Sequence, residues 1–328
     1  MKIIEKNDLI FIAGDKGMVG SAIKRSLLRN GYSNLITASK KDLDLSDYKS
    51  VKQWFELHKP QIVILAAARV GGIYANYRFP CDFILENLKI QTNVIEIAKE
   101  NNVKRFLFLG SSCIYPKICK QPIKEESLLT GALEITNEPY AIAKIAGLKL
   151  CSAMRKQYNF DAISLMPTNL YGPGDNYHAT NSHVLPSFIN KFHTAMEKNY
   201  KEVVCWGTGN PLREFLHVDD LADACIFALE KYQILISNDK FKDQTEFLNV
   251  GTGNDISIKD LANIIARKIG FKGKIIWDKS KHDGTPRKLL DVSRINKLGW
   301  HASISLEKGI EETIKSYIYE KENNQLRR

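Results

Sequence analysis

Three glycines near the start of the chain place the strongest constraint on its fold. Gly14, Gly17 and Gly20 form the pattern G-x-x-G-x-x-G between the apolar run LIFIA (9–13) and a helix-forming segment. Glycines at this spacing permit a tight turn, close approach of the backbone to a pyrophosphate and close helix packing, while the helix N-terminus attracts phosphate charge. The pattern is also compatible with a plain turn, but its position between a strand and a helix favours a dinucleotide site.

Strand and helix patterns alternate after this turn. The predicted strands are apolar without an alternating polar face, as expected where helices cover both faces of a parallel sheet. The sequence therefore predicts an α/β protein with a Rossmann-type, doubly wound parallel sheet. The predicted elements are strand 9–14, helix 17–31, strand 34–39, helix 48–58, strand 61–68, helix 82–101, strand 105–112, helix 139–158 and strand 161–173.

A change of pattern suggests where the first domain ends. Beyond Gly172 the sequence becomes irregular and rich in proline, asparagine and histidine before short helices and strands resume. We expect residues 1–172 to form an NADP-binding Rossmann domain and residues 173–328 to form mainly a smaller C-terminal substrate-binding lobe. Segments near 210–230 and 247–253 are expected to return to the first domain. Ligands of open parallel sheets bind beyond the C-terminal ends of the strands, so the lobe should cover that edge.

Composition excludes several other classes of protein. The 328 residues are 44% hydrophobic, enough for a sizeable core. The six cysteines are scattered, without a C-x-x-C pair or a histidine cluster at zinc-ligand spacing, so neither a metal site nor disulfides are expected. No apolar run is long enough to span a membrane, and the charged N-terminal segment is unlike a signal peptide, which predicts a cytoplasmic protein. The formal net charge is +10, but the lysines are dispersed, so nucleic-acid binding is not expected.

The segment after the second predicted strand bears on cofactor choice. An NAD-selective site usually places an acidic side chain there, against the ribose 2′-hydroxyl. This chain has Thr37, Ala38 and Ser39, followed by Lys40 and Lys41. Basic side chains can hold a 2′-phosphate by charge-assisted hydrogen bonds, so the segment predicts NADP(H), with contacts from Ser39 and Lys40. The alternative is a solvated basic turn.

A catalytic site is indicated by three hydroxyl and amine side chains. Tyr140 and Lys144 stand at i and i+4 of a predicted helix, so their side chains share one face. A nearby ammonium lowers the pKa of a phenol, which would let Tyr140 exchange a proton with a carbonyl oxygen. Ser111, at the end of the strand before this helix, could hydrogen-bond the same oxygen. A surface pair and a turn serine are the alternatives.

These motifs resemble the extended short-chain dehydrogenase/reductase family and, within it, the GDP-L-fucose synthases. The resemblance covers nearly the whole chain. It is carried by GDKGMVG (14–20), AAARVGGI (66–73), GSSCIYP (110–116), NEPYAIAKIAG (137–147), MPTNLYGP (166–173), NSHVLP (181–186), WGTGNPLREFLHVDD (206–220) and DGTPRK (283–288).

The resemblance implies a reaction with two stages. That family inverts C3 and C5 of GDP-4-keto-6-deoxy-D-mannose and then reduces C4 with NADPH. Cys113 and His183 match the family's pair for the proton transfers. Taken alone, Cys113 could be a small buried hydrophobe, although positive charge nearby would favour a thiolate base. His183 could be a polar residue without a catalytic role, although a histidine titrates near neutral pH.

The resemblance also implies binding residues. Trp206 matches a contact on the guanosine side, Arg213 a contact to the diphosphate and Asp283 a polar contact, and Lys191 replaces a substrate-binding arginine. Arg213 could instead form an ion pair in the VDD segment that follows. The family's arginines for the 2′-phosphate are replaced here near Ala38 and Lys40. For the cofactor, the implied residues are Gly14, Gly17, Met18, Val19, Gly20, Ser39, Lys40, Leu109, Gly110, Ser111, Ser112, Lys144, Pro167, Thr168, Asn169, Leu170 and His183.

Two other functions remain open from sequence. The chain could be another NAD(P)-dependent sugar-nucleotide epimerase or dehydratase, but Cys113 and His183 stand in place of the usual dehydratase acid pair. It could also be a nucleotide-binding scaffold without catalysis, which retention of the serine, tyrosine and lysine argues against. By analogy with family members, the helices near 82–101 and 139–158 suggest a homodimer.

Overall fold

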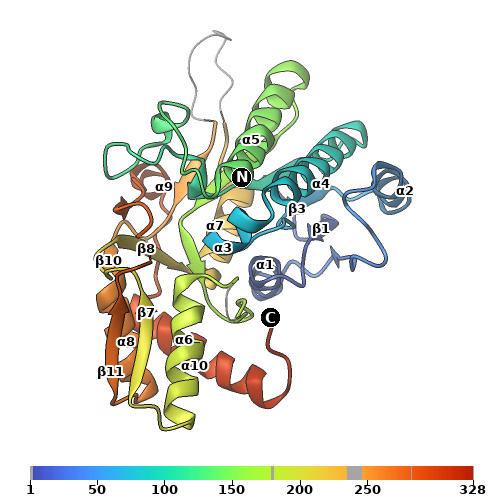
Figure 1. Cartoon of the computed structure of the whole chain (residues 1–328). Helices are drawn as coiled ribbons and strands as arrows, with labels where there is room; N and C mark the ends of the chain where they lie inside the picture. Colours follow the sequence, from blue (N-terminus) through green and yellow to red (C-terminus); the bar gives the residue numbers. More distant parts are fainter. Residues whose placement is uncertain (1–2, 179–180, 235–245, 282, 328) are drawn as a thin grey trace.

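The central sheet confirms the fold predicted from sequence. The structure is a computed structural model that describes residues 3–178, 181–234, 246–281 and 283–327. Its first lobe holds a six-stranded parallel sheet in the order β2-β1-β3-β4-β5-β9 (Figure 1). The strand order reverses around β1, so the C-terminal ends of β1 and β3 flank a position where ligands of such sheets bind. The strands are β1 (Ile10–Ala13), β2 (Leu35–Ile36), β3 (Ile62–Leu65), β4 (Arg105–Leu109), β5 (Ala162–Pro167) and β9 (Leu248–Val250).

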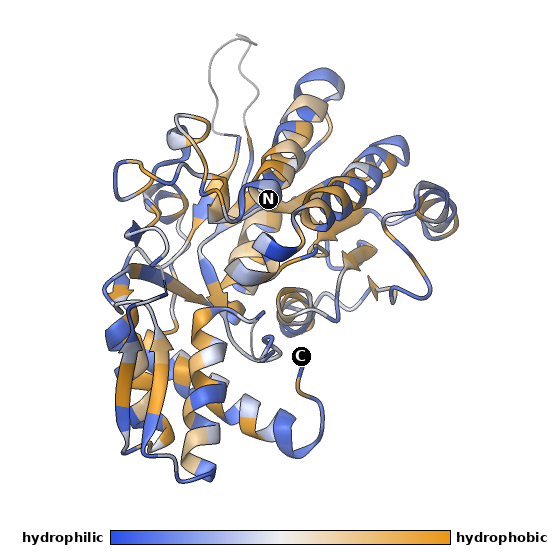
Figure 2. Ribbon diagram, viewed as in Figure 1, coloured by the Kyte–Doolittle hydropathy of each residue, from blue (hydrophilic) through white to orange (hydrophobic). Residues whose placement is uncertain are grey.

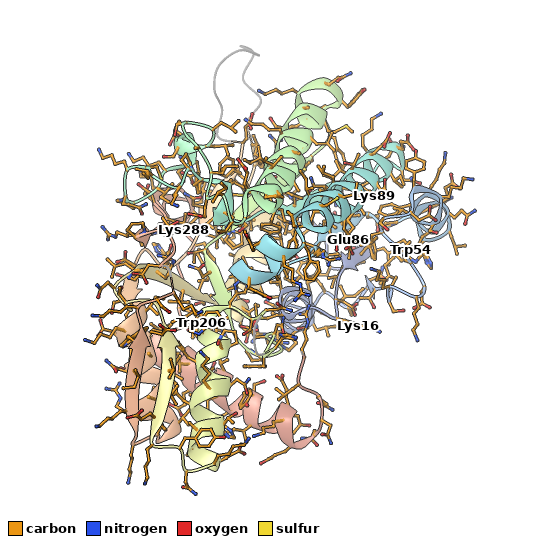
Figure 3. The ribbon with its side chains drawn as sticks, viewed as in Figure 1. Lys16, Trp54, Glu86, Lys89, Trp206 and Lys288 are labelled. Carbon is orange, nitrogen blue, oxygen red and sulfur yellow. The ribbon has the colours of Figure 1, made fainter. Side chains whose placement is uncertain are left out.

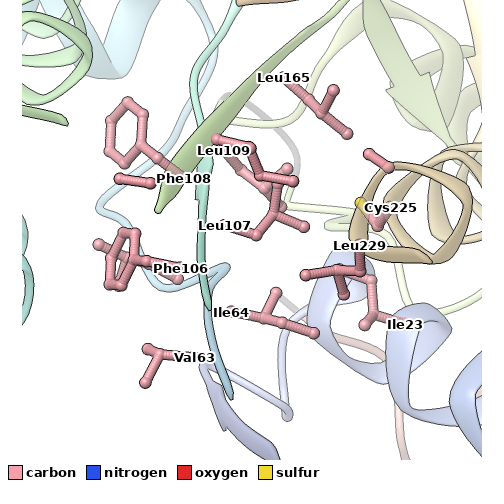
Figure 4. Close-up of a cluster of buried hydrophobic side chains, with 14 of the residues drawn as sticks. Ile23, Val63, Ile64, Phe106, Leu107, Phe108, Leu109, Leu165, Cys225 and Leu229 are labelled. Atoms are coloured by element: carbon pink, nitrogen blue, oxygen red, sulfur yellow. The ribbon is translucent and has the colours of Figure 1, made fainter. Parts of the chain in front are cut away.

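Helices cover both faces of this sheet. On one face α1 packs against α7, and on the other α4 packs against α2 and α5. Figure 4 shows the division within the core, where Ile64 and Leu107 point toward Leu229 of α7 while Phe106 and Phe108 point away. The strands are strongly hydrophobic in Figure 2, in agreement with the burial of all of them except the partly buried β2. The first-lobe helices are α1 (Met18–Arg29), α2 (Tyr48–His58), α3 (Ile73–Arg78), α4 (Pro80–Glu100), α5 (Glu138–Tyr158), α7 (Val218–Lys231) and α9 (Ser293–Lys297).

The single strand predicted over 161–173 is wrong, because it divides between two sheets. β5 remains in the central sheet, whereas β6 (Asn169–Tyr171) pairs with β8 (Leu212–His217) of the second lobe. At the crossover, the Thr168 amide donates to the carbonyl of Val250 at 3.0 Å. The apolar run does not reveal this change of partner, because the strand that pairs with β6 lies far along the chain.

The second lobe has its own hydrophobic core under two small sheets. β8 is flanked by β6, β10 and β12, and β7 pairs with β11. Aromatic side chains from α6 and α10 fill the core between the helices and strands. The elements are β7 (Glu202–Trp206), β10 (Asp255–Ser257), β11 (Lys274–Asp278), β12 (Arg287–Lys288), α6 (Val184–Glu197), α8 (Ile258–Ile269) and α10 (Leu306–Glu322), with short 3-10 turns at Ser112–Ile114 and Glu125–Ser127.

We propose to keep the domain division near residue 172, with α7 and β9 counted in the first lobe because they pack into its sheet.

In the part of the chain that the structure describes, no helix has both the length and the apolar character needed to cross a membrane. The same described ranges contain no group of three or more histidine, cysteine or acidic side chains suited to hold a metal ion.

Candidate functional site

A cavity of about 880 Å³ lies between the two lobes, at the C-terminal edge of the central sheet. The first lobe contributes the glycine turn, the end of β4 and the start of α5, and the second lobe contributes α6, β7 and β8. Figure 3 shows the two sides, with Glu86 and Lys16 on the first lobe and Trp206 on the second. The cavity is lined by every site residue predicted from sequence except Gly20 and Ser39, namely Gly14, Gly17, Met18, Val19, Lys40, Leu109, Gly110, Ser111, Ser112, Cys113, Tyr140, Lys144, Pro167, Thr168, Asn169, Leu170, His183, Lys191, Trp206, Arg213 and Asp283.

The glycine turn has the shape that a dinucleotide pyrophosphate requires. Gly14 has φ +95°, and a Cβ there would lie 2.7 Å from the amide nitrogen of Ala67. A Cβ on Gly20 would lie 2.1 Å from the Gly14 carbonyl oxygen, so this glycine serves close packing of α1 and does not line the cavity. Gly17 caps α1 without a side-chain hydrogen bond, and the first turn carries no acidic residue. The N-terminal amides of α1 are therefore suited to receive an anion.

Ser39 and Lys40, the residues predicted to contact the cofactor ribose, both interact with acidic side chains. The Ser39 hydroxyl donates to Asp42, which turns it away from the cavity. Lys40 Nζ lies 3.4 Å from Glu86 Oε1, and Arg69 Nη1 donates to the other carboxylate oxygen at 2.8 Å. Hydrogen bonding to Arg69 lowers the pKa of Glu86, which keeps this carboxylate charged. The Lys40 side chain is nonetheless 78% exposed, so its ammonium can move to a bound phosphate.

Tyr140 and Lys144 lie on the buried face of α5, as the i, i+4 spacing predicts. Burial raises the pKa of Tyr140, electrostatic interaction with Cys113 adds to this, and a hydrogen bond with Ser111 opposes it. The expectation that Lys144 would lower the pKa of Tyr140 is not met. Lys144 Nζ donates to the Leu109 carbonyl at 2.9 Å, and burial lowers its pKa to about 8. A phenol held protonated in this way is a proton donor.

Close packing of α5 on the sheet sets the position of these two side chains. A Cβ on Gly147, one turn after Lys144, would lie 2.6 Å from Cζ of Phe108 in β4. The backbone carbonyl of Ala143, also in α5, accepts a hydrogen bond from the side-chain amide of Gln91 in α4. Only a glycine allows α5 this close to β4, and the contact brings Lys144 within reach of the strand's last carbonyl.

Cys113 lies in the 3-10 turn Ser112–Ile114 after β4 and has two polar partners that the sequence reasoning did not identify. Asn137 Nδ2 lies 3.4 Å from its sulfur, and Lys288 Nζ lies 3.6 Å from it. The Cys113 amide donates to Ser111 Oγ at 3.2 Å, which fixes the turn between these two residues. Asn137 and Lys288 each belong to a segment that carried the family resemblance. Comparison of those segments with the family could therefore have indicated both residues. The thiol therefore faces a cation and an amide donor.

His183 stands at the N-cap of α6 and is exposed to the cavity. Water reaches the ring, but protein surrounds it on the cavity walls, and this desolvation lowers the pKa of His183 below its ordinary value. The imidazole is therefore mainly neutral near pH 7 in the cofactor-free protein. A nearby anion would favour the charged form.

Trp206 offers an aromatic platform at the second-lobe end of the cavity. The residue is 55% exposed, and Lys191 and Lys281 place their ammonium groups 5.4 Å and 5.9 Å from its ring centroid. Asp283 accepts hydrogen bonds from the Thr208 amide at 2.9 Å and hydroxyl at 2.6 Å. Asp283 therefore fixes the turn after Trp206 in addition to lining the cavity. An exposed aromatic ring between two cations suits a base attached to phosphates.

Arg213 enters the same region from β8. Its pKa is lowered by burial and raised by Asp283, and Nη1 donates to the Leu212 carbonyl at 2.8 Å. The alternative pairing with the VDD segment is wrong. Asp219 pairs with Arg25 at 2.7 Å, and Asp220 accepts from the amides of residues 303 and 304. The guanidinium is thus directed toward the cavity.

The neighbouring Glu214 explains how remote loops meet at β8. Its buried carboxylate accepts from the amides of Thr252 at 2.7 Å, Gly253 at 2.8 Å and Leu290 at 3.0 Å. Three backbone donors on one carboxylate tie the loop after β9 and the loop after β12 to the strand that carries Arg213.

Residues 10–242 match the protein family described as the NAD dependent epimerase/dehydratase family. GDP-L-fucose synthase 1 of Arabidopsis thaliana is 54% identical over 96% of this chain and 94% of its own length. GDP-L-fucose synthase of Escherichia coli K12 is 51% identical over 94% of this chain and 96% of its own. A crystal structure of a GDP-L-fucose synthetase from Naegleria fowleri bound to NADP superposes with a TM-score of 0.86 and 27% identity, covering 98% of this chain and 97% of that one.

Proposed function

The chain belongs to the NAD dependent epimerase/dehydratase family, and from this premise we propose that it converts GDP-4-keto-6-deoxy-D-mannose to GDP-L-fucose by inverting C3 and C5 and then reducing C4. The observation that carries the proposal is the placement of a thiol and a phenol beside one another at Ser111. Cys113 packs against the cluster that contains Tyr140, the backbone amide of Cys113 donates to Ser111 Oγ, and Tyr140 hydrogen-bonds the Ser111 side chain. Two proton-transfer groups beside one another match a reaction that combines epimerisation with reduction.

NADP(H) is the cofactor that the residues fit. The first turn of α1 and Gly17 would hold the pyrophosphate, and Lys40 would hold the 2′-phosphate. The Leu109–Ser112 and Pro167–Leu170 segments would flank the nicotinamide beside Lys144. When bound, NADPH supplies the hydride for C4. Glycines that a Cβ would obstruct, together with a helix N-terminus without a side-chain cap, support this assignment.

Epimerisation requires a proton to leave and return at C3 and at C5. The C4 ketone acidifies both C–H bonds, because the electron pair left on carbon delocalises onto the carbonyl oxygen. Cys113 acts as a thiolate, which the Lys288 ammonium stabilises before the reaction, and its sulfur removes the proton from one face to become a neutral thiol. His183 returns a proton to the opposite face, which inverts the carbon. The diphosphate of the substrate supplies negative charge that favours the protonated imidazole.

Reduction at C4 requires a proton on the carbonyl oxygen. Tyr140 is held protonated by burial, so its hydroxyl donates to that oxygen, with the Ser111 hydroxyl as a second hydrogen-bond partner. Lys144 lies one helical turn away and carries a readily titrated amine with a pKa of about 8. This amine is placed to replenish the phenolic proton.

Trp206, Lys191 and Arg213 are assigned to the GDP portion of the substrate. The exposed indole would pack on guanine, and the guanidinium and ammonium would bind the diphosphate. Lysine keeps the charge of the family's arginine at position 191 but lacks its paired donors. Asp283 would hold the Trp206 turn and make a polar contact with the sugar nucleotide.

The product of a reaction with GDP-4-keto-6-deoxy-D-mannose and NADPH, identified by NMR, tests the proposal. GDP-L-fucose is the expected product, with deuterium at C3 and C5 when the solvent is D₂O. Cys113→Ser and His183→Gln should each slow that exchange by about 10²–10⁴-fold, and Cys113→Ser should do so without loss of NADPH binding. A product with the original configuration at C3 and C5, or an unsaturated sugar, would support another epimerase or dehydratase instead.

A homodimer is proposed on the strength of two neighbouring helices. α4 and α5 pack together on one side of the first lobe (Figure 1), and they expose Leu85 (48%) and Ile142 (42%). Leu85→Glu combined with Ile142→Glu should produce a monomer in light scattering, because charge in an apolar interface is costly. The cytoplasmic location stays a prediction.

A further inference from the structure

The side chain of Arg327, at the end of the described chain, reaches the glycine turn of the first lobe. A Cβ built on Gly17 would lie 3.9 Å from Nη1 of Arg327. Arg327 lines the same cavity as Gly14 and Met18. No sequence motif draws attention to this residue, because it stands outside every segment that carried the family resemblance.

The tail that carries Arg327 has a defined path between the lobes. It leaves α10, turns at Asn324 with φ 55°, and then runs toward α1 (Figure 1). The Gln325 amide donates to the Glu320 carbonyl at 2.7 Å, and the Tyr177 amide donates to the Arg327 carbonyl at 2.9 Å. Leu326 packs against the core of the second lobe. These contacts hold the Arg327 backbone beside the segment that faces the cavity.

The guanidinium of Arg327 is not neutralised by a direct ion pair with any residue that the structure describes. Among residues 3–178, 181–234, 246–281 and 283–327, no carboxylate forms an ion pair with its guanidinium and no acceptor hydrogen-bonds it. Asp175 interacts with it electrostatically, and Oδ2 of this buried carboxyl group has no hydrogen-bond partner within the same ranges. Glu320, the other acidic neighbour of the segment, accepts from the Gly174 amide at 3.0 Å and the Ser316 hydroxyl at 2.6 Å. The guanidinium therefore keeps its donors for a further anion.

We propose that Arg327 binds the pyrophosphate of the dinucleotide cofactor, so that the C-terminal tail completes the cofactor site from the second lobe. Gly17 is the residue at which the backbone of such a turn approaches the pyrophosphate, and the guanidinium lies on the side of Gly17 where a Cβ would stand. The planar fork of an arginine matches two phosphate oxygens. This inference rests on the assignment of residues 14–20 to the cofactor.

The dissociation constants of NADPH and NADH, measured by fluorescence without sugar substrate, test the inference. Both cofactors contain the pyrophosphate, so Arg327→Ala should weaken both by about tenfold or more, and Arg327→Lys should weaken both less. Removal of residues 327–328 should match Arg327→Ala. Arg267→Ala is the control, because this exposed arginine pairs with Glu307 in the second lobe and should leave both constants unchanged. Thermal unfolding verifies that each variant is folded.

The outcomes separate the possible contacts. Wild-type affinity for both cofactors in folded Arg327→Ala would overturn the inference. Loss of NADPH affinity alone would assign Arg327 to the 2′-phosphate and would likewise overturn the pyrophosphate contact. A wild-type protein that binds neither cofactor would contradict the cofactor assignment itself, which is a failure of the proposed function and is seen before any variant is compared.

Discussion

Lys288 Nζ lies 3.6 Å from Cys113 Sγ although 175 positions separate the two residues in the sequence. β12 makes this contact possible, because it pairs with β8 in a register that sets Lys288 opposite Arg213. One strand pairing therefore brings two cations to the cavity. The ammonium is placed to stabilise the Cys113 thiolate, the form of the side chain that can remove a proton.

Lys288→Met should slow deuterium incorporation into the keto sugar by about 10–100-fold, because a charge-assisted contact of about 1.5–3 kcal/mol is lost. NADPH binding should not change. Lys279→Met, which removes an exposed lysine near the end of β11, is the matched control and should exchange at the wild-type rate. Exchange at the wild-type rate in Lys288→Met would mean that this lysine only packs against the thiol.

Tyr140→Phe should separate reduction from epimerisation. The ring keeps its packing, so folding and NADPH binding should persist, while loss of the proton donor should slow reduction by about 10²–10⁴-fold. Exchange at C3 and C5 should continue, because it is assigned to Cys113 and His183. The measurement is NADPH absorbance beside NMR of the keto sugar in D₂O. A folded variant that oxidises NADPH at close to the wild-type rate would contradict the mechanism.

The pKa of His183 should lie below its ordinary value in the free protein and should rise when GDP is bound. Desolvation disfavours the charged imidazole and so lowers its pKa. As pH falls, His183 therefore gains its proton later than a fully solvated histidine does. The negative diphosphate of GDP favours the charged form and should move the midpoint upward. Histidine NMR resonances followed against pH provide the measurement, with His183→Gln for assignment, and a GDP-independent midpoint would argue against placement beside the diphosphate.

NADPH should be preferred over NADH by at least about tenfold, and Lys40→Ala should reduce that preference. Glu86 holds Lys40 in the cofactor-free protein, so Glu86→Gln should strengthen NADPH binding up to about fivefold, the effect expected of an exposed ion pair. Dissociation constants for both cofactors measure the ratio. Equal constants for NADPH and NADH in the wild type would show that Lys40 does not meet the 2′-phosphate.

Local pattern determined the scaffold of this protein. The glycine turn, the apolar strands and the i, i+4 pair of Tyr140 and Lys144 are recognisable because strand, turn and helix each impose a short-range spacing on the sequence. For the same reason, Ser111 and Cys113 could be expected at the C-terminal edge of the sheet. The sequence also supplied the family resemblance, and with it the residues assigned to the substrate.

Only the tertiary structure decided which remote groups share the cavity and what charge they carry. Lys288 reaches Cys113 through a strand pairing, and Arg327 reaches Gly17 through a tail that crosses between lobes, so neither contact leaves a local pattern. The pKa of Tyr140 rises because burial outweighs the hydrogen bond with Ser111, and burial depends on all the elements packed around the phenol. Sequence spacing fixes neighbours one turn or one strand position apart, whereas long-range pairing and desolvation exist only after the chain has folded.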